Sequence, residues 1–371
     1  MMEKRAKIFF PNLNGVRAIA ALMVVFSHIE LHKKDFHITK FTGLDYLQLG
    51  NVGVSIFFSL SGFLITYLLL EEKKNFAKVN LKDFYIRRIL RIWPLYFLVI
   101  IVGFLIYPGT VSAKPLLLSV FFLPNIAFTL SLLPPLIQPI WSVGIEEQFY
   151  IFHPHFFRIK KNQHILYALL LFIVLFFAAF VVVKYSHSTN VALNQFLYLA
   201  CYDDMMIGAI VALIYFNTKN KTFDFRFQHF FNLLFNRYAQ VALLVAFAGF
   251  MWINLHMIVP QYDVILALLS ALLIVNLCET ETSIYSLDNK LFQFVGRISY
   301  GIYLLHKFPL LLVVYLVNKY MGGQSLLLQN IVIYITTCAA AVGIAAISYY
   351  GYERYFLQLK KRFQKISNNS V

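Results

Sequence analysis

The sequence predicts an all-α fold, a membrane-embedded bundle of about ten transmembrane spans with one further short or re-entrant segment. Of the 371 residues, 60% are hydrophobic and 13% are charged, whereas soluble domains average roughly 25% charged residues. The mean hydropathy is +0.69. Apolar runs recur along the whole length and leave no interval long enough for a soluble domain. We therefore expect one integral-membrane domain over residues 1–371, with spans from about residue 12 to about residue 350.

The individual spans follow from the need for about 20 apolar residues to cross a bilayer. Nine stretches have this character: 12–31, 51–70, 92–108, 165–183, 195–215, 238–257, 262–277, 298–317 and 328–350.

Two weaker stretches, 116–132 and 141–157, lie between the third and fourth spans. Only one of them can cross completely if the basic loops are to stay on one side. We favour 141–157 as the crossing, because Pro124 interrupts helical hydrogen bonding in 116–132 and irregular backbone must be sheltered by protein. The stretch 116–132 is then the short or re-entrant segment.

The positive charge of the chain, formally +15, is explained by membrane topology. With ten spans, 24 Lys and Arg residues fall on one side and 6 on the other, and basic residues are retained in cytoplasmic loops. Both termini are thereby predicted to be cytoplasmic in a multi-pass protein of the inner (cytoplasmic) membrane, and no nucleic-acid partner is needed. We expect the basic tail 351–371 to be a short interfacial helix followed by disorder.

Arg17 and His28 share the first span. Eleven residues correspond to three helical turns plus roughly 20°, so both side chains project from one face, with a rise of about 16 Å between them. Ionisable residues within spans are functional candidates by default. The alternative is an arginine that extends to the headgroups and a hydrogen-bonded histidine near the outer interface.

Arg87, Arg88 and Arg91 stand at the cytoplasmic entrance of the third span. Arg88 and Arg91 are three residues apart on one helical face, where two guanidinium groups can hold phosphate oxygens. The alternative is an ordinary basic anchor of the positive-inside kind.

Glu146 and Glu147 lie inside the apolar segment 139–156. A buried carboxylate requires a partner such as arginine, histidine or water, and Glu146 and Tyr150 share a face that Glu147 does not. The alternative is a solvated outer loop.

Further polar residues in the spans are Asp203, Asp204 and His306, each compatible with a structural or a functional role. His153 and His155 are a weak metal pair without a third ligand at suitable spacing. The three cysteines are far apart and indicate neither disulfides nor a metal site. The chain has no P-loop and no GxSxG motif.

Several segments together resemble the acyltransferase 3 family, the polytopic bacterial O-acyltransferases. In chain order they are LNGVRAIAALMVVFSHIE, NVGVSIFFSLSGFLITYLLL, FYIRRILRIWPLYF, LPN, PIWSVGIEEQFYIFHP and FVGRISYGIYLLHKFPL. The resemblance runs from about residue 13 to residue 310 and on through the last span. Some relatives carry a soluble hydrolase-like domain after the last span, and we expect none in the roughly 20 residues that follow it here.

The resemblance implies transfer of an acyl group, commonly acetyl, from cytoplasmic acyl-coenzyme A to a hydroxyl of a carbohydrate or similar extracytoplasmic acceptor. It implies that His28 is catalytic and that Arg17 is its basic partner in the first span. It further implies that Arg88 and Arg91 bind the coenzyme's phosphates and that Glu146 belongs to the site. Acyl-coenzyme A is then a co-substrate, with no permanently bound cofactor or metal.

The chemistry of the residues fits this activity, since histidine titrates near neutral pH and can activate a hydroxyl. We expect His28 to activate the acceptor or to take the acyl group itself, and a carboxylate such as Glu146 to orient the imidazole. The competing hypothesis is a proton-coupled exporter of a sugar or lipid precursor, because such proteins also bury acids and histidines in their spans.

Overall fold

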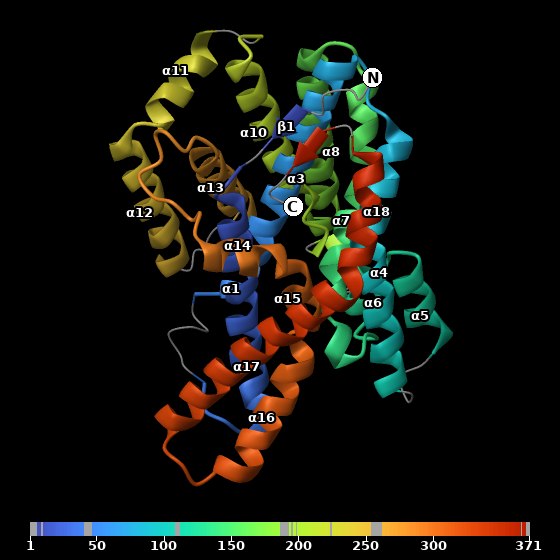
Figure 1. The fold of residues 1–371 in the computed structure, drawn as a ribbon, viewed down its shortest axis with the longest axis vertical. Helices are drawn as coiled ribbons and strands as arrows, with labels where there is room; N and C mark the ends of the chain where they lie inside the picture. Colours follow the sequence, from blue (N-terminus) through green and yellow to red (C-terminus); the bar gives the residue numbers. More distant parts are fainter. Residues whose placement is uncertain are drawn as a thin grey trace.

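The computed structural model describes residues 6–8, 10–40, 47–107, 112–185, 193, 196–197, 199–222, 225–253, 262–364 and 366–368. Almost all ordered elements in these ranges are helices, which confirms the all-α prediction (Figure 1). One small parallel pair of strands, β1 (Ala6–Ile8) and β2 (Ile366–Asn368), is the exception. Parts of the predicted spans 195–215 and 238–257 lie outside the described residues.

Within the described ranges, five helices are long and apolar enough to cross a bilayer: Leu13–Phe36, Leu49–Phe76, Leu81–Ile106, Asn162–Val183 and Leu326–Phe363. Two bent pairs raise this number to seven if each counts as one span: Phe227–Leu234 with Arg237–Trp252, and Ser299–Leu305 with Lys307–Met321. The chain is therefore a multi-pass helical protein, and the finer count of ten spans stays a prediction.

The first half of the fold consists of α1 (Leu13–Lys33), η1 (Lys34–Phe36), α3 (Leu49–Phe76), α4 (Leu81–Ile106), α5 (Ala113–Val120), α6 (Pro124–Thr129), η3 (Pro135–Ile137), α7 (Ile140–Phe152), η4 (His153–Arg158) and α8 (Asn162–Tyr185). The second half consists of α10 (Tyr202–Lys219), α11 (Phe225–Leu234), α12 (Arg237–Ile253), α13 (Tyr262–Cys278), α14 (Lys290–Arg297), α15 (Ser299–Leu305), α16 (Lys307–Met321) and α17 (Leu326–Ser348).

The region between α4 and α8 is broken into short pieces, as Pro124 predicts. Helix α6 begins at Pro124, where a missing amide proton has no cost in the first turn. Helix α7 has only 13 residues, fewer than the roughly 20 of a complete crossing. Helix α7 continues directly into η4, so this helical segment runs from Ile140 to Arg158. Neither 116–132 nor 141–157 is among the described helices that are long and apolar enough to span, so 141–157 as the crossing stays a prediction.

The centre of the bundle is a close crossing of α3 and α10. A methyl group at Gly62 would lie 1.9 Å from the Met205 carbonyl oxygen, and one at Gly208 would lie 2.1 Å from the Ser59 carbonyl oxygen. Small residues let helix backbones approach in membranes. Helix α1 packs on α3 and α14, and α10 packs on α13.

The C-terminal tail is ordered further than the sequence predicts. After α17 the chain continues through a π-helical turn η6 (Tyr349–Glu353), α18 (Arg354–Lys360) and η7 (Lys361–Phe363). Strand β2 then pairs with β1, with Ala6 opposite Ile366 and Ile8 opposite Asn368. The expected disorder after a short helix is therefore wrong for 366–368, because backbone hydrogen bonding to the N-terminal segment orders it. In Figure 1, α18 lies beside α4.

Candidate functional site

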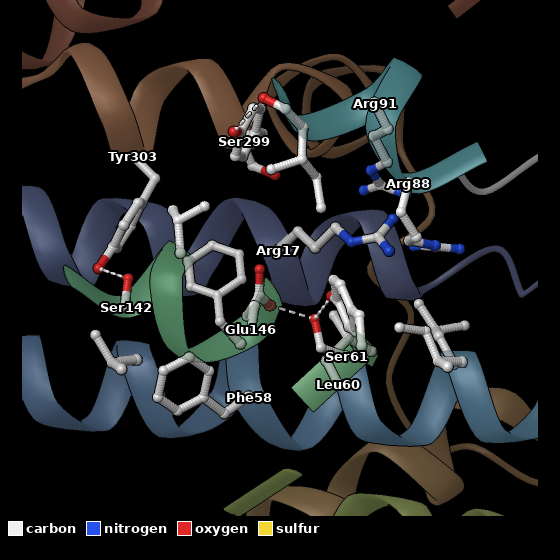
Figure 2. Close-up of a pocket in the computed structure, with 18 of the residues that line it drawn as sticks. Arg17, Phe58, Leu60, Ser61, Arg88, Arg91, Ser142, Glu146, Ser299 and Tyr303 are labelled. Carbon is white, nitrogen blue, oxygen red and sulfur yellow. Dashed lines mark hydrogen bonds between the residues drawn. The ribbon is translucent and has the colours of Figure 1, made fainter. Parts of the chain in front are cut away.

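A pocket of about 860 Å³, including space open to solvent, lies between α1, α3, α4, α7 and α15. Its polar lining residues are Arg17, Ser61, Arg88, Arg91, Ser142, Glu146, Tyr150, Ser299, Tyr300 and Tyr303. Four of the five residues assigned from sequence are among them. Helices far apart in the chain thus bring these side chains together (Figure 2).

The three arginines occupy one end of the pocket. Figure 2 shows Arg17 reaching from α1 toward Arg88 and Arg91, which both extend from α4. The charges of Arg91 and Arg88 act on Arg17, whose side chain also donates a hydrogen bond of 3.4 Å to Asn14. The prediction that Arg88 and Arg91 share one helical face is confirmed, because both line the same pocket.

The N-terminus of α4, the helix that carries Arg88 and Arg91, is fixed by a capping residue. The Asn80 side chain accepts a hydrogen bond from the Asp83 backbone amide and caps the helix. The Arg88 guanidinium lies 5.6 Å from the ring centroids of both Phe84 and Tyr150, and its buried Nε has no hydrogen-bond partner among the described residues. Aromatic rings therefore hold Arg88 in place while its polar atoms stay available to an anion.

Glu146 lies among the arginines and polar side chains. Its Oε1 accepts a 2.5 Å hydrogen bond from Ser61 Oγ, which in turn accepts one of 3.2 Å from the Tyr150 hydroxyl. Glu147 points elsewhere and accepts a 3.0 Å hydrogen bond from Trp93 Nε1. The two adjacent carboxylates therefore diverge, as their helical positions predict, and only Glu146 faces the pocket.

His28 does not line this pocket. Its Nδ1 lies 2.6 Å from Nε2 of His306, and the two rings are parallel within 6° with centroids 4.9 Å apart. The centroid distance is close to the N–N distance plus two ring radii, so the rings meet edge to edge in one plane. The expected pairing of Glu146 with the imidazole is thus not found; the partner of His28 is a second histidine.

His306 owes its position to the bend between α15 and α16. Pro309 cannot donate to the Leu305 carbonyl, and the two helices diverge by 52° at this point. The fully buried His306 places Nδ1 2.8 Å from the Tyr303 carbonyl oxygen and 3.2 Å from that of Ile302. Since a carbonyl can only accept, Nδ1 of His306 carries the proton.

Tyr303 connects the histidine pair to the pocket. It lines the pocket, and its hydroxyl lies 2.7 Å from Ser142 Oγ on α7. Its ring centroid is 6.4 Å from that of His306. Tyr303 therefore lines the pocket and also lies close to the His28–His306 pair.

Residues 10–350 of the chain match the sequence model of the acyltransferase domain that defines the acyltransferase 3 family. The chain belongs to the acyltransferase 3 family.

Curated relatives of this acyltransferase 3 chain include the peptidoglycan O-acetyltransferase OatA of Listeria monocytogenes, 26% identical over 80% of the chain and 49% of the relative. A candidate peptidoglycan O-acetyltransferase of Bacillus subtilis, YrhL, is 29% identical over 56% of the chain and 33% of the relative. A candidate O-acetyltransferase of Staphylococcus aureus is 32% identical over 39% and 24%. The chain spans about half or less of these relatives. No solved structure matches.

The acyltransferase 3 site contains residues that sequence reasoning did not assign. Ser61, Ser142 and Tyr303 are uncharged, and nothing in their spacing distinguishes them from packing residues. The sequence leaves His306 open to a structural or a functional role, although it follows Tyr303 by three residues on one helical face. Lys360 lines a second pocket, of about 550 Å³, that shares Arg88 and Arg91 with the first.

Two other histidines of this acyltransferase 3 chain are not brought together. His153 is buried with Nε2 2.8 Å from the Thr66 hydroxyl, whereas His155 Nε2 lies 3.0 Å from the Tyr85 hydroxyl. Among the described residues, no group of three or more His, Cys, Asp or Glu side chains could hold a metal ion.

Proposed function

We propose that the chain is a membrane O-acyltransferase that moves an acyl group, acetyl by preference, from acyl-coenzyme A to a carbohydrate hydroxyl. The observation that carries this proposal is the division of the site along α1. An arginine cluster surrounds Arg17, and a hydrogen-bonded histidine pair contains His28.

The arginine end suits the donor's phosphates. Arg17, Arg88 and Arg91 line a pocket that contains the carboxylate of Glu146, so positive charge is in excess there. Guanidinium groups form charge-assisted, bidentate hydrogen bonds with phosphate oxygens.

The distance between Arg17 and His28 suits the pantetheine arm and thioester of the donor. Arg17 and His28 are separated by a rise of about 16 Å along α1. Coenzyme A thioesters carry their phosphates and their reactive sulfur at opposite ends of a long, flexible pantetheine arm. The largely apolar wall of the pocket between Arg17 and Tyr303, which includes Phe57 and Phe58, fits that arm.

The histidine end supplies a base with a defined tautomer. His306 is fully buried, contacts no carboxylate among the described residues and donates from Nδ1 to Tyr303, so we take it as neutral, with Nε2 as acceptor. His28 then donates from Nδ1 to His306 Nε2. This leaves the lone pair of His28 Nε2 available for the reaction.

In the transfer, His28 Nε2 takes the proton of the acceptor hydroxyl as its oxygen attacks the thioester carbonyl carbon. The carbon–sulfur bond of the resulting tetrahedral intermediate breaks, and the leaving sulfur takes the proton from the imidazolium. The products are an ester and a free thiol. Transfer through an acyl group on His28 Nε2 uses the same tautomer, and acyl label retained on purified protein distinguishes the two routes.

The membrane orientation completes the proposal. The Lys and Arg distribution favours ten spans with cytoplasmic termini. Strand β1 lies near the N-terminus and β2 near the C-terminus, so their pairing supports both termini lying on the same side of the membrane. Arg17, near the N-terminus, then faces cytoplasmic acyl-coenzyme A, and His28 lies toward the outer acceptor. The relative named for peptidoglycan supports a cell-envelope carbohydrate as acceptor.

The test is thiol release from acetyl-coenzyme A by the purified protein in the presence of a peptidoglycan-derived acceptor. We expect release with the wild type, and with His28→Ala a rate lower by at least about 10²-fold. A control at His164, an exposed histidine of α8, is His164→Ala, which is expected to retain activity. Release from both the wild type and His28→Ala that does not exceed a protein-free blank contradicts the proposal and favours an exporter.

A further inference from the structure

The tail helix α18 brings a buried lysine to the arginine cluster. Lys360 is only 7% exposed, and it lines the second pocket together with Arg87, Arg88 and Arg91. The charges of Arg17 and of these three arginines all act on its ammonium group. The Lys360 ammonium group has no hydrogen-bond or ion-pair partner within the described part of the chain.

Few carboxylates balance these cations. Glu72 is the acidic residue of the second pocket, and its oxygens accept hydrogen bonds from Arg87 Nη2 at 3.1 Å and from the Asn80 amide at 2.8 Å. Glu72 is thus engaged by Arg87 and the α4 N-terminus. Glu146 also acts on Arg17, Arg88 and Arg91, and Glu353 acts on Arg91. Positive charge still exceeds negative charge around Lys360. That excess is costly in a partly buried site, and a bound polyanion removes the cost.

The tail is fastened so that Lys360 stays in this place. Arg87 Nη1 donates a 2.9 Å hydrogen bond to the Phe363 carbonyl oxygen, three residues beyond Lys360. Before α18 in the chain, the Tyr352 hydroxyl donates a 3.3 Å hydrogen bond to the Pro94 carbonyl oxygen. The β1–β2 pair fixes the chain end. Lys360 therefore belongs to an ordered segment that packs on α4 and not to a free basic tail.

We propose that Lys360 binds the phosphate groups of a polyphosphate-bearing acyl donor, so that the C-terminal tail forms one wall of the donor site. This inference rests on the proposed function for the acyl part of the donor and goes beyond it in assigning the tail to the site. The two pockets meet at Arg88 and Arg91, so a donor that extends from Lys360 past the arginines enters the first pocket with its pantetheine arm.

The test compares Lys360→Met, which keeps an unbranched apolar stem without the charge, with Lys361→Met on the neighbouring exposed residue. The substrates are acetyl-coenzyme A and acetyl-pantetheine, which lacks all phosphates. We expect Lys360→Met to raise the KM for acetyl-coenzyme A by about tenfold or more. Its kcat/KM for acetyl-pantetheine stays at the wild-type value. Lys361→Met matches the wild type with both donors, and Lys360→Arg restores most of the affinity.

Binding of 3′,5′-ADP to the protein in nanodiscs of zwitterionic lipid gives a second readout that needs no turnover. We expect Lys360→Met to weaken it and Lys361→Met to leave it unchanged. If the wild type consumes neither thioester, the proposed function fails, while this binding measurement still decides the role of Lys360.

Three results overturn the inference. The first is equal donor KM and equal nucleotide binding in both variants. The second is a loss that is the same for acetyl-coenzyme A and acetyl-pantetheine, which indicates a structural role. The third is no nucleotide binding in zwitterionic nanodiscs together with a Lys360-dependent requirement for anionic lipid, which assigns the phosphate to a lipid headgroup.

Discussion

At the scale of single residues, the site depends on partners that sequence position does not reveal. The types and helical faces of Arg17, Arg88, Arg91 and Glu146 made them candidates, and the family resemblance assigned them to one site. One pocket contains them all. The partner of His28 was not predictable, because it is 278 residues away and depends on how α15 packs against α1.

His306 is expected to act as a positioning residue for His28. Replacing it by phenylalanine removes the acceptor for His28 Nδ1, so the imidazole is no longer held in the tautomer that exposes Nε2. We expect kcat to fall by about tenfold or more with little change in the KM for acetyl-coenzyme A. Steady-state kinetics on detergent-purified protein measures both constants.

The variant His306→Gln serves as the partial rescue, since its amide oxygen can still accept from His28. A merely structural role would instead lower the yield of monodisperse protein in both variants without altering kcat per folded molecule.

At the scale of elements, length and hydropathy identified the long helices, whereas short and broken helices form the site. Helix α7 carries Glu146 on only 13 residues, and α15 presents Tyr303 on only seven. Such pieces lack the roughly 20-residue apolar signal of a span. The break in the helix before Pro124 could be predicted because proline has a direct effect on backbone hydrogen bonding, and the re-entrant path of 116–132 stays a prediction.

The crossing of α3 and α10 provides an element-level prediction. In Gly62→Ala the new methyl group meets the Met205 carbonyl oxygen, so the helices must separate. We expect destabilisation by roughly 1–3 kcal/mol, seen as a lower midpoint of thermal unfolding in detergent.

Gly249→Ala in α12 is the matched control, because a methyl group there meets no atom within 4 Å. An equal unfolding midpoint for the two variants would be incompatible with the close α3–α10 packing.

At the scale of the whole molecule, composition predicted a multi-pass helical membrane protein, and the structure agrees. The exact number of crossings is harder to predict, because bent pairs such as α15 and α16 divide one apolar run into two directions. The order of the tail was missed, since a basic, polar end resembles a disordered one until its contacts with α4 and β1 are known.

Topology can be measured with single cysteines in a variant lacking Cys201, Cys278 and Cys338. Lys361→Cys, at an exposed tail position, is expected to react with a membrane-impermeant maleimide only after the cells are permeabilised. Gly323→Cys, in the exposed turn between α16 and α17, is expected to react in intact cells. Labelling of both positions in intact cells would contradict cytoplasmic termini.

The most direct test of the central claim, transfer from a cytoplasmic donor to an outer acceptor through His28, uses proteoliposomes. Labelled acetyl-coenzyme A is added on the face that carries the C-terminal tail, and a peptidoglycan fragment is enclosed on the other. We predict that the wild type acetylates the enclosed fragment and that His28→Ala leaves it unlabelled. Equal labelling by both proteins, or label that never leaves the donor side in the wild type, would contradict the account.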